Sequence, residues 1–188
     1  YADLEWVAGY IALAKLDAPE QAAIHFKNHF DAVQTPVSLG RAGYWQGRAA
    51  EALKDFDAAA DFFRQGAEHQ TSFYGQLAAE RIGAEPDPAL VGLTGAPNWR
   101  DSAIAQTGPV RAGILLHRAD SQYLMRWFLS HVAETTDQTE SAQLAQLALD
   151  LDRPYVALAI AKEAAKRGII LPQAYFPVTD LAAFSGPV

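Results

Sequence analysis

The stretch "HQTSFYGQLAAERIG" (residues 69–83) predicts one short helix with a clear start and a clear end, and it decides the fold. Thr71 or Ser72 can begin the helix, since a side-chain oxygen accepts a hydrogen bond from a free backbone N–H at a helix start. Gly83 can end it in a left-handed conformation. Between these ends, apolar residues recur at helical spacing. Gly75 interrupts the pattern, because a glycine inside a helix costs about 1 kcal/mol relative to alanine.

The composition of the whole chain agrees with a helical protein. Its 188 residues fit one domain or a compact module of a larger protein, and 50% of them are hydrophobic, enough for a sizeable core. Alanine is abundant and β-branched runs are scarce, which favours helices over strands. The net charge of -7 argues against a nucleic-acid partner. The absence of cysteine excludes disulfides and thiolate zinc sites, and no apolar run approaches the ~20 residues of a membrane span.

The helical pattern repeats in the first half of the chain. "AGY" occurs at residues 8–10 and again at 42–44, 34 residues later, and the pair Ala22 and Phe26 recurs 37 residues later. Such a period is typical of degenerate tetratricopeptide (TPR) repeats, in which helix hairpins stack. We therefore predict an all-α fold of antiparallel helix hairpins stacked as a TPR-like right-handed superhelix, an α-solenoid. An ordinary helical bundle is the alternative.

The same pattern predicts the domain organisation. One α-superhelical domain is expected over residues 1–170. It divides into TPR-like hairpins at 1–83, a Pro/Gly-rich break at 84–98 and further helix pairs at 99–170. Residues 171–188 form an apolar, proline-containing tail, which we expect to dock on another surface.

Several helix ends can be predicted from single residues. Asp17 is expected to cap the second helix, with Pro19 in its first turn, and Asp55 or Asp57 to cap the fourth. After the break, the first helix is predicted over residues 99–106.

Two histidines suggest a metal site only superficially. His25 and His29 in "HFKNH" lie one helical turn apart, as in a two-histidine zinc clamp, but Phe26 stands where a zinc protease needs a glutamate. No third ligand is evident, so we expect no metal and no cofactor. Both histidine side chains are expected to be exposed to solvent. The sequence also has no phosphate-binding loop, nucleophile elbow, dinucleotide fingerprint or evident carboxylate pair. No catalytic residue is predicted.

Aromatic residues are the only candidates for a binding site. They fall on the first helices of successive hairpins, at Trp6, Tyr10, Tyr44, Trp45, Phe73 and Tyr74. We single out Tyr44, Trp45, Phe73 and Tyr74. Their simplest role is packing between stacked repeats, and the alternative is stacking on a ligand such as a sugar ring. Gly75, beside two of them, is expected to let a neighbouring backbone approach.

Three segments stand in a specific order along the chain: "FYGQLAAERIG" (73–83), "TESAQLAQLALDLDRPYVALAIAKEAAKRG" (139–168) and "AYFPVTDLAAF" (174–184). Together they resemble the soluble periplasmic lytic transglycosylases, in the last part of the helical superhelix that precedes the lysozyme-like catalytic domain. The segments cover the second half of the chain and more. Each alone is unspecific, whereas the ordered set is fairly specific.

The resemblance implies a parent enzyme that cleaves peptidoglycan between N-acetylmuramic acid and N-acetylglucosamine, forming a 1,6-anhydro product without metal or cofactor. It also implies one catalytic glutamate in a Glu-Ser motif, followed by a Gly-Leu-Met-Gln-type segment. Here the only Glu-Ser, Glu140–Ser141, belongs to the superhelix match, and the only methionine is Met125. We therefore expect this chain to be inactive and the catalytic domain to follow it.

The leading hypothesis is a non-catalytic superhelical module of a peptidoglycan lytic transglycosylase. It would be a periplasmic monomer that scaffolds its own C-terminal catalytic domain and contacts glycan strands, with no nucleic acid and no membrane span. The chain opens inside a helical pattern without an initiator methionine, so we expect a piece of a longer protein, with its signal peptide outside these residues. The alternative hypothesis is a TPR-like adaptor that binds a protein partner.

Overall fold

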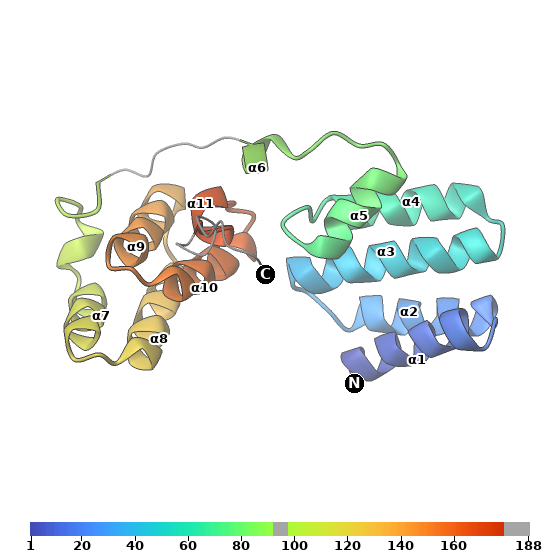
Figure 1. Cartoon of the computed structure of the whole chain (residues 1–188), viewed down its shortest axis with the longest axis horizontal. Coiled ribbons are helices and arrows are strands. Elements are labelled where there is room, and N and C mark those ends of the chain that lie inside the picture. Colours follow the sequence, from blue (N-terminus) through green and yellow to red (C-terminus); the bar gives the residue numbers. More distant parts are fainter. Residues whose placement is uncertain (92–97, 179–188) are drawn as a thin grey trace, which may run out of the picture. The chain divides into compact units, whose positions relative to one another are not determined.

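The computed structural model describes residues 1–91 and 98–178, and all regular structure within them is helical (Figure 1). The all-α prediction is confirmed, and most helices pack against a neighbour in the chain. The described residues hold eleven α-helices and one short 3-10 helix: α1 (Ala2–Lys15), α2 (Pro19–Asp31), α3 (Pro36–Ala52), α4 (Phe56–Ala67), α5 (Phe73–Arg81), α6 (Pro88–Val91), η1 (Ile104–Gln106), α7 (Gly108–Arg118), α8 (Gln122–Ala133), α9 (Gln138–Asp150), α10 (Pro154–Ala165) and α11 (Pro172–Tyr175).

The contacts divide the chain into two compact units, called unit 1 (Tyr1–Asp87) and unit 2 (from Pro88 onward). Each unit has its own hydrophobic core. The boundary falls inside the predicted break at 84–98, of which residues 92–97 lie outside the described residues. A single superhelical domain over residues 1–170 stays a prediction.

Four helix hairpins share the same turn. One residue ends the first helix, the next has a left-handed φ between 50° and 62°, and the one after it is the N-cap of the second helix. The left-handed residues are Asp17, Lys54, Asp120 and Asp152. Around Lys54, its N–H donates to the Glu51 carbonyl at 2.9 Å and the Asp55 N–H donates to the Ala50 carbonyl at 3.0 Å, the two bonds of a Schellman motif. So short a connection makes the two helices antiparallel neighbours.

Two predicted caps are found in the structure. Ser72, rather than Thr71, caps α5 by accepting the Gly75 N–H at 3.1 Å. Asp55 caps α4 by accepting the Ala58 N–H at 3.1 Å. These residues satisfy backbone N–H groups that have no partner inside the helix.

The prediction that Asp17 caps α2 is wrong. Asp17 is the left-handed residue of the first turn, and Ala18 stands at the N-cap without a side-chain hydrogen bond. Aspartate suits both positions, since its short polar side chain also tolerates the left-handed conformation. The same residue type therefore marks the end of one helix as well as the start of the next.

The helix predicted over residues 99–106 is also wrong, because only Ile104–Gln106 form a short 3-10 helix. The Ser102 hydroxyl donates to the Trp99 carbonyl at 2.6 Å, closing a local turn. A serine side chain that bonds to nearby backbone competes with the regular helix pattern.

Unit 1 stacks two hairpins and a fifth helix. α1 packs on α2, α3 packs on α4, and α3 also contacts α2 and α5 (Figure 1). The two hairpins repeat one contact: a Cβ on Gly9 would lie 2.6 Å from the Phe26 ring, and one on Gly47 would lie 2.5 Å from the Phe63 ring. The glycines are 38 residues apart and the rings 37. The repeat in space therefore follows the 37-residue spacing rather than the 34-residue spacing of "AGY".

Gly75 lies in the first turn of α5, where two backbone segments approach it. A Cβ on Gly75 would overlap the carbonyl group of His69, in the turn just before the helix. On the other side, a Cβ on Gly40 of α3 would lie 3.1 Å from the Gly75 nitrogen. Gly75 therefore permits a close backbone approach, and the nearest backbone is that of its own preceding turn.

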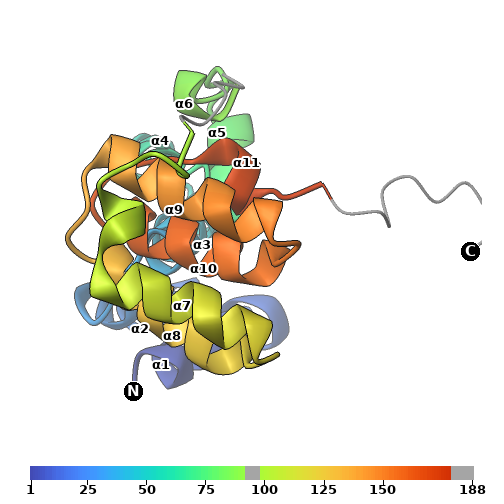
Figure 2. The same ribbon diagram turned by 90° about the vertical axis from the view of Figure 1, so that its left-hand side faces the viewer.

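Unit 2 is built around α10. α7 pairs with α8 and α9 with α10, and α10 also contacts α8 and α11 (Figure 2). The core is formed mainly by aliphatic side chains of these helices, among them Met125, Leu129, Leu144, Leu147, Val156 and Ile160. The described start of the predicted tail docks on this core through Leu171, Ala174 and Tyr175. The remainder of the tail, from residue 179, lies outside the described residues.

Candidate functional site

Three of the four candidate aromatics are brought together in unit 1. The Tyr44 ring lies 5.5 Å from the Trp45 ring and 5.4 Å from the Tyr74 ring, and Trp45 lies 6.1 Å from Tyr74. Tyr44 is buried, whereas Trp45 and Tyr74 are half-buried. These rings join α3 to α5, so packing between helices is their evident role.

Phe73 differs from the other three. Its ring lies 5.2 Å from that of Tyr74, yet its side chain is 69% exposed. An exposed ring supported by a second aromatic can stack on a flat ligand such as a sugar. Phe73 is therefore the one candidate of the four with a face free for a ligand.

The aromatic contacts continue from α3 to α1. Trp45 lies 6.2 Å from Trp6 and 5.3 Å from Tyr10, both on α1. The guanidinium of Arg41 lies 4.8 Å above the Trp6 ring and is held by Asp3 at 2.7 Å. This hydrogen bond from Arg41 lowers the pKa of Asp3. The aromatic band thus spans α1, α3 and α5 and joins successive helix pairs of unit 1.

The two histidines have separate protein partners. His25 Nδ1 contacts Glu5 at 2.8 Å, and this hydrogen bond lowers the pKa of Glu5. His29 is fully buried, so the prediction of two solvated histidines is wrong for it; its Nδ1 lies 2.9 Å from the Ala2 carbonyl, and burial lowers its pKa. Within residues 1–91 and 98–178, no group of three His, Cys, Asp or Glu side chains could hold a metal ion.

The only Glu-Ser pair of the chain caps a helix. Glu140 and Asp137 form a reciprocal capping box at the start of α9: Asp137 accepts the Glu140 N–H at 2.8 Å, and Glu140 accepts the Asp137 N–H at 3.3 Å. Ser141 is fully buried, with its hydroxyl 2.8 Å from that of Thr136. Both side chains are therefore used to hold the helix start.

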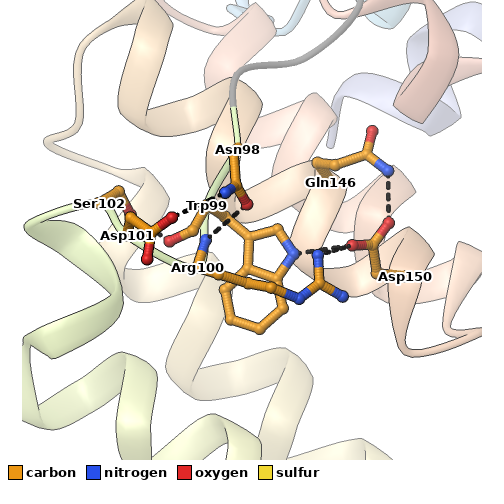
Figure 3. A network of polar contacts seen from close by, with 7 residues as sticks. All are labelled: Asn98, Trp99, Arg100, Asp101, Ser102, Gln146 and Asp150. Carbon is orange, nitrogen blue, oxygen red and sulfur yellow. Dashed lines mark hydrogen bonds and ion pairs between the residues drawn. The ribbon is translucent and has the colours of Figure 1, made fainter.

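Among the described residues of unit 2, the carboxylate with the most hydrogen bonds is that of Asp150, at the end of α9. It accepts hydrogen bonds from Trp99 Nε1 at 2.9 Å, Arg100 at 2.7 Å and Gln146 at 2.6 Å (Figure 3). Burial alone would raise the pKa of Asp150, but these hydrogen bonds and the charge of Arg100 outweigh it and lower the pKa. Asp150 therefore ties the segment after residue 97 to α9, and its ionised form is favoured.

Sequence reasoning missed a groove in unit 1. Side chains of α2, α3 and α4 line a cavity of about 600 Å³, whose walls are largely apolar. Gln46 of α3 lines it and is 8% exposed, and its Oε1 has no hydrogen-bond partner among the described residues. The burial of Gln46 could have been predicted from its position in the helix, since it lies on the same face as the buried Ala42, Ala49 and Ala50.

Comparisons with protein-family models, with curated proteins and with solved structures found no match. No helix in the described part of the chain is long and apolar enough to cross a membrane.

Proposed function

We propose that this chain is a non-catalytic helical module of a periplasmic peptidoglycan lytic transglycosylase and acts as a scaffold for its catalytic domain. The family assignment rests on the three ordered segments of the sequence. The observation that carries the non-catalytic role is the capping box, because it uses the only Glu-Ser pair of the chain. A catalytic glutamate would instead need a cleft that raises its pKa.

The carboxylate environments support the same role. The pKa values of Asp3, Glu5 and Asp150 are all lowered. A carboxyl that donates a proton to a glycosidic oxygen at neutral pH needs the opposite shift.

The finer architecture is part of the proposal. We infer that the hairpins continue as a TPR-like right-handed superhelix. This is supported by the turn that four hairpins share and by the glycine–phenylalanine contact that recurs from α1–α2 to α3–α4.

The catalytic part of the proposal can be tested with purified peptidoglycan. We expect the chain alone to release no 1,6-anhydro-muropeptides, detected by mass spectrometry. The same chain extended by the residues that its gene encodes downstream should release them. Anhydro products from the chain alone would contradict the non-catalytic role. A downstream sequence without a Glu-Ser motif would contradict the family assignment.

Glycan binding at Phe73 can be tested separately by co-sedimentation with insoluble peptidoglycan. Loss of an exposed stacking ring is worth about 1 kcal/mol, so Phe73→Ala should weaken binding about fivefold. Phe56→Ala is a matched control, since Phe56 also begins a helix and is 67% exposed. If the unchanged protein does not sediment, the glycan contact is refuted and the scaffold role alone remains.

A second candidate function, a TPR-like adaptor for a protein partner, is favoured by the groove that contains Gln46. Helical repeat proteins often bind other protein chains on such concave apolar surfaces.

A further inference from the structure

The groove of unit 1 has the size and lining of a binding site. Its volume of about 600 Å³ lies in the usual range for ligand pockets, about 300–1,000 Å³. The apolar side chains that line it include Ile24 and Phe30 of α2, Leu53 after α3, and Phe62 of α4. Ile24 is 61% exposed and Leu53 is 39% exposed, so an occupant of the groove would cover apolar surface that now faces solvent.

Gln46 gives the groove one specific polar group. Its side chain is more than nine-tenths buried, and the buried Oε1 lacks a hydrogen-bond partner in the described protein. Such a carbonyl costs about 1–3 kcal/mol when it is left unpaired. A carboxamide presents one acceptor and two donors in a plane, which matches the N–H and C=O groups of a peptide unit.

The charges at the groove are unequal. Lys27 is paired with Asp31 at 2.6 Å, so these two charges cancel. Asp55 accepts the Ala58 N–H at 3.1 Å, and no cation forms an ion pair with it among the described residues. The groove therefore carries one excess negative charge, which favours a basic group on the occupant.

We propose that this groove binds a peptide segment of a partner protein. Apolar side chains of the segment fill the space between α2 and α4, and a Lys or Arg side chain lies beside Asp55. The carboxamide of Gln46, whose Oε1 is shielded in the empty groove, turns toward the segment and pairs with one of its backbone amides. A fatty acid fits less well, because its carboxylate would be repelled by Asp55. A sugar fits less well, because apolar walls would leave its hydroxyls unpaired. The inference does not rest on the transglycosylase proposal, and either can fail alone.

The occupant can be sought with a phage-displayed library of random 12-residue peptides panned on the whole chain. We expect the enriched peptides to combine two or more apolar residues with a Lys or Arg. Their affinity is then measured by fluorescence anisotropy. Gln46→Met keeps the length of the side chain and removes the amide, so it should weaken binding about tenfold. Asp55→Asn keeps the helix cap and removes the charge, so it should weaken binding about threefold.

Matched controls separate binding from folding. Gln21→Met on α2 and Asp57→Asn on α4 make the same changes at exposed residues outside the groove lining, and both should bind like the unchanged protein. Without peptide, Gln46→Met should raise the melting temperature, because it removes a buried carbonyl without a partner.

Several results would overturn the proposal. One is a lower melting temperature for Gln46→Met, which would give Gln46 a structural role. Another is a peptide that binds Gln46→Met and the unchanged protein equally, or a library that yields no binder. Displacement of the bound peptide by the fluorescent fatty acid cis-parinaric acid or by N-acetylglucosamine oligomers would assign the groove to a lipid or a glycan instead.

Discussion

Gly75 has no room for a side chain, since the carbonyl group of His69 occupies the place of its Cβ. We expect Gly75→Ala to lower the free energy of unfolding by about 2 kcal/mol, because backbone atoms must move to admit the methyl group. Urea denaturation measures this change. Gly108→Ala is the control, as a Cβ there meets nothing within 4 Å, and it should be neutral or slightly stabilising. Equal effects of the two substitutions would contradict the prediction.

Lys54 is the one left-handed turn residue of the four hairpins that is not an aspartate. A left-handed conformation costs a residue with a Cβ about 1–2 kcal/mol, and glycine avoids this cost. After allowing for the greater freedom of glycine in the unfolded chain, Lys54→Gly should raise the free energy of unfolding by about 1 kcal/mol. Lys15→Gly, at the end of α1, should have the opposite sign. Urea denaturation of both variants distinguishes these outcomes.

Single residues also show how far the sequence could predict the structure. Ser72, Asp55 and Gly83 were recognisable because each satisfies a local backbone requirement, and Gly83 has the expected left-handed φ of 63°. The sequence could not tell which of Phe73 and Tyr74 is exposed. Neighbouring side chains on a helix point about 100° apart, and which of them is covered depends on the helices that pack against it. Gln46 was missed because a glutamine inside a helix usually faces water.

At the scale of elements, the conformation of the segment before η1 depends on contacts with a residue that is distant in the sequence. Trp99 and Arg100 both bond to Asp150, about 50 residues later in the chain (Figure 3). A helical pattern in residues 99–106 could not reveal this tertiary contact, which explains the wrong helix prediction. The helices of the hairpins, by contrast, were predictable from local periodicity and caps.

Asp150 makes the stability of this element depend on pH. Its pKa is lower in the folded protein, so the unfolded chain takes up the proton first as pH falls, and the stability that Asp150 provides is lost below the ordinary value of about 3.9. Asp150→Asn should therefore be less stable than the unchanged protein at pH 7, and the gap should close toward pH 3. Urea denaturation at both pH values measures the gap. Asp152→Asn makes the same change at a carboxylate that has no side-chain hydrogen bond or ion pair among the described residues, and it serves as the control. A gap that stays constant with pH would refute the role of Asp150.

At the scale of the whole molecule, the two units carry separate cores. We expect two unfolding transitions in differential scanning calorimetry. Gly75→Ala should lower one transition and Leu147→Ala the other, since Leu147 is 1% exposed in the core of unit 2. A buried Leu→Ala change costs about 2–5 kcal/mol, which shifts the transition of a small unit by about 10 °C or more. A single transition lowered by both substitutions would contradict independent units.

The shared turn also has a consequence for the speed of folding. Each hairpin connects helices that are neighbours in sequence, so most contacts are local and little chain entropy is lost in closing them. Proteins dominated by such contacts fold in microseconds to milliseconds. During synthesis, α1 and α2 can pair as soon as Asp31 has left the ribosome, before α3 has left it. The chain can thus build its structure one hairpin at a time, each hairpin presenting the apolar face on which the next helix packs, as α1 and α2 do for Trp45 and Ala49 of α3.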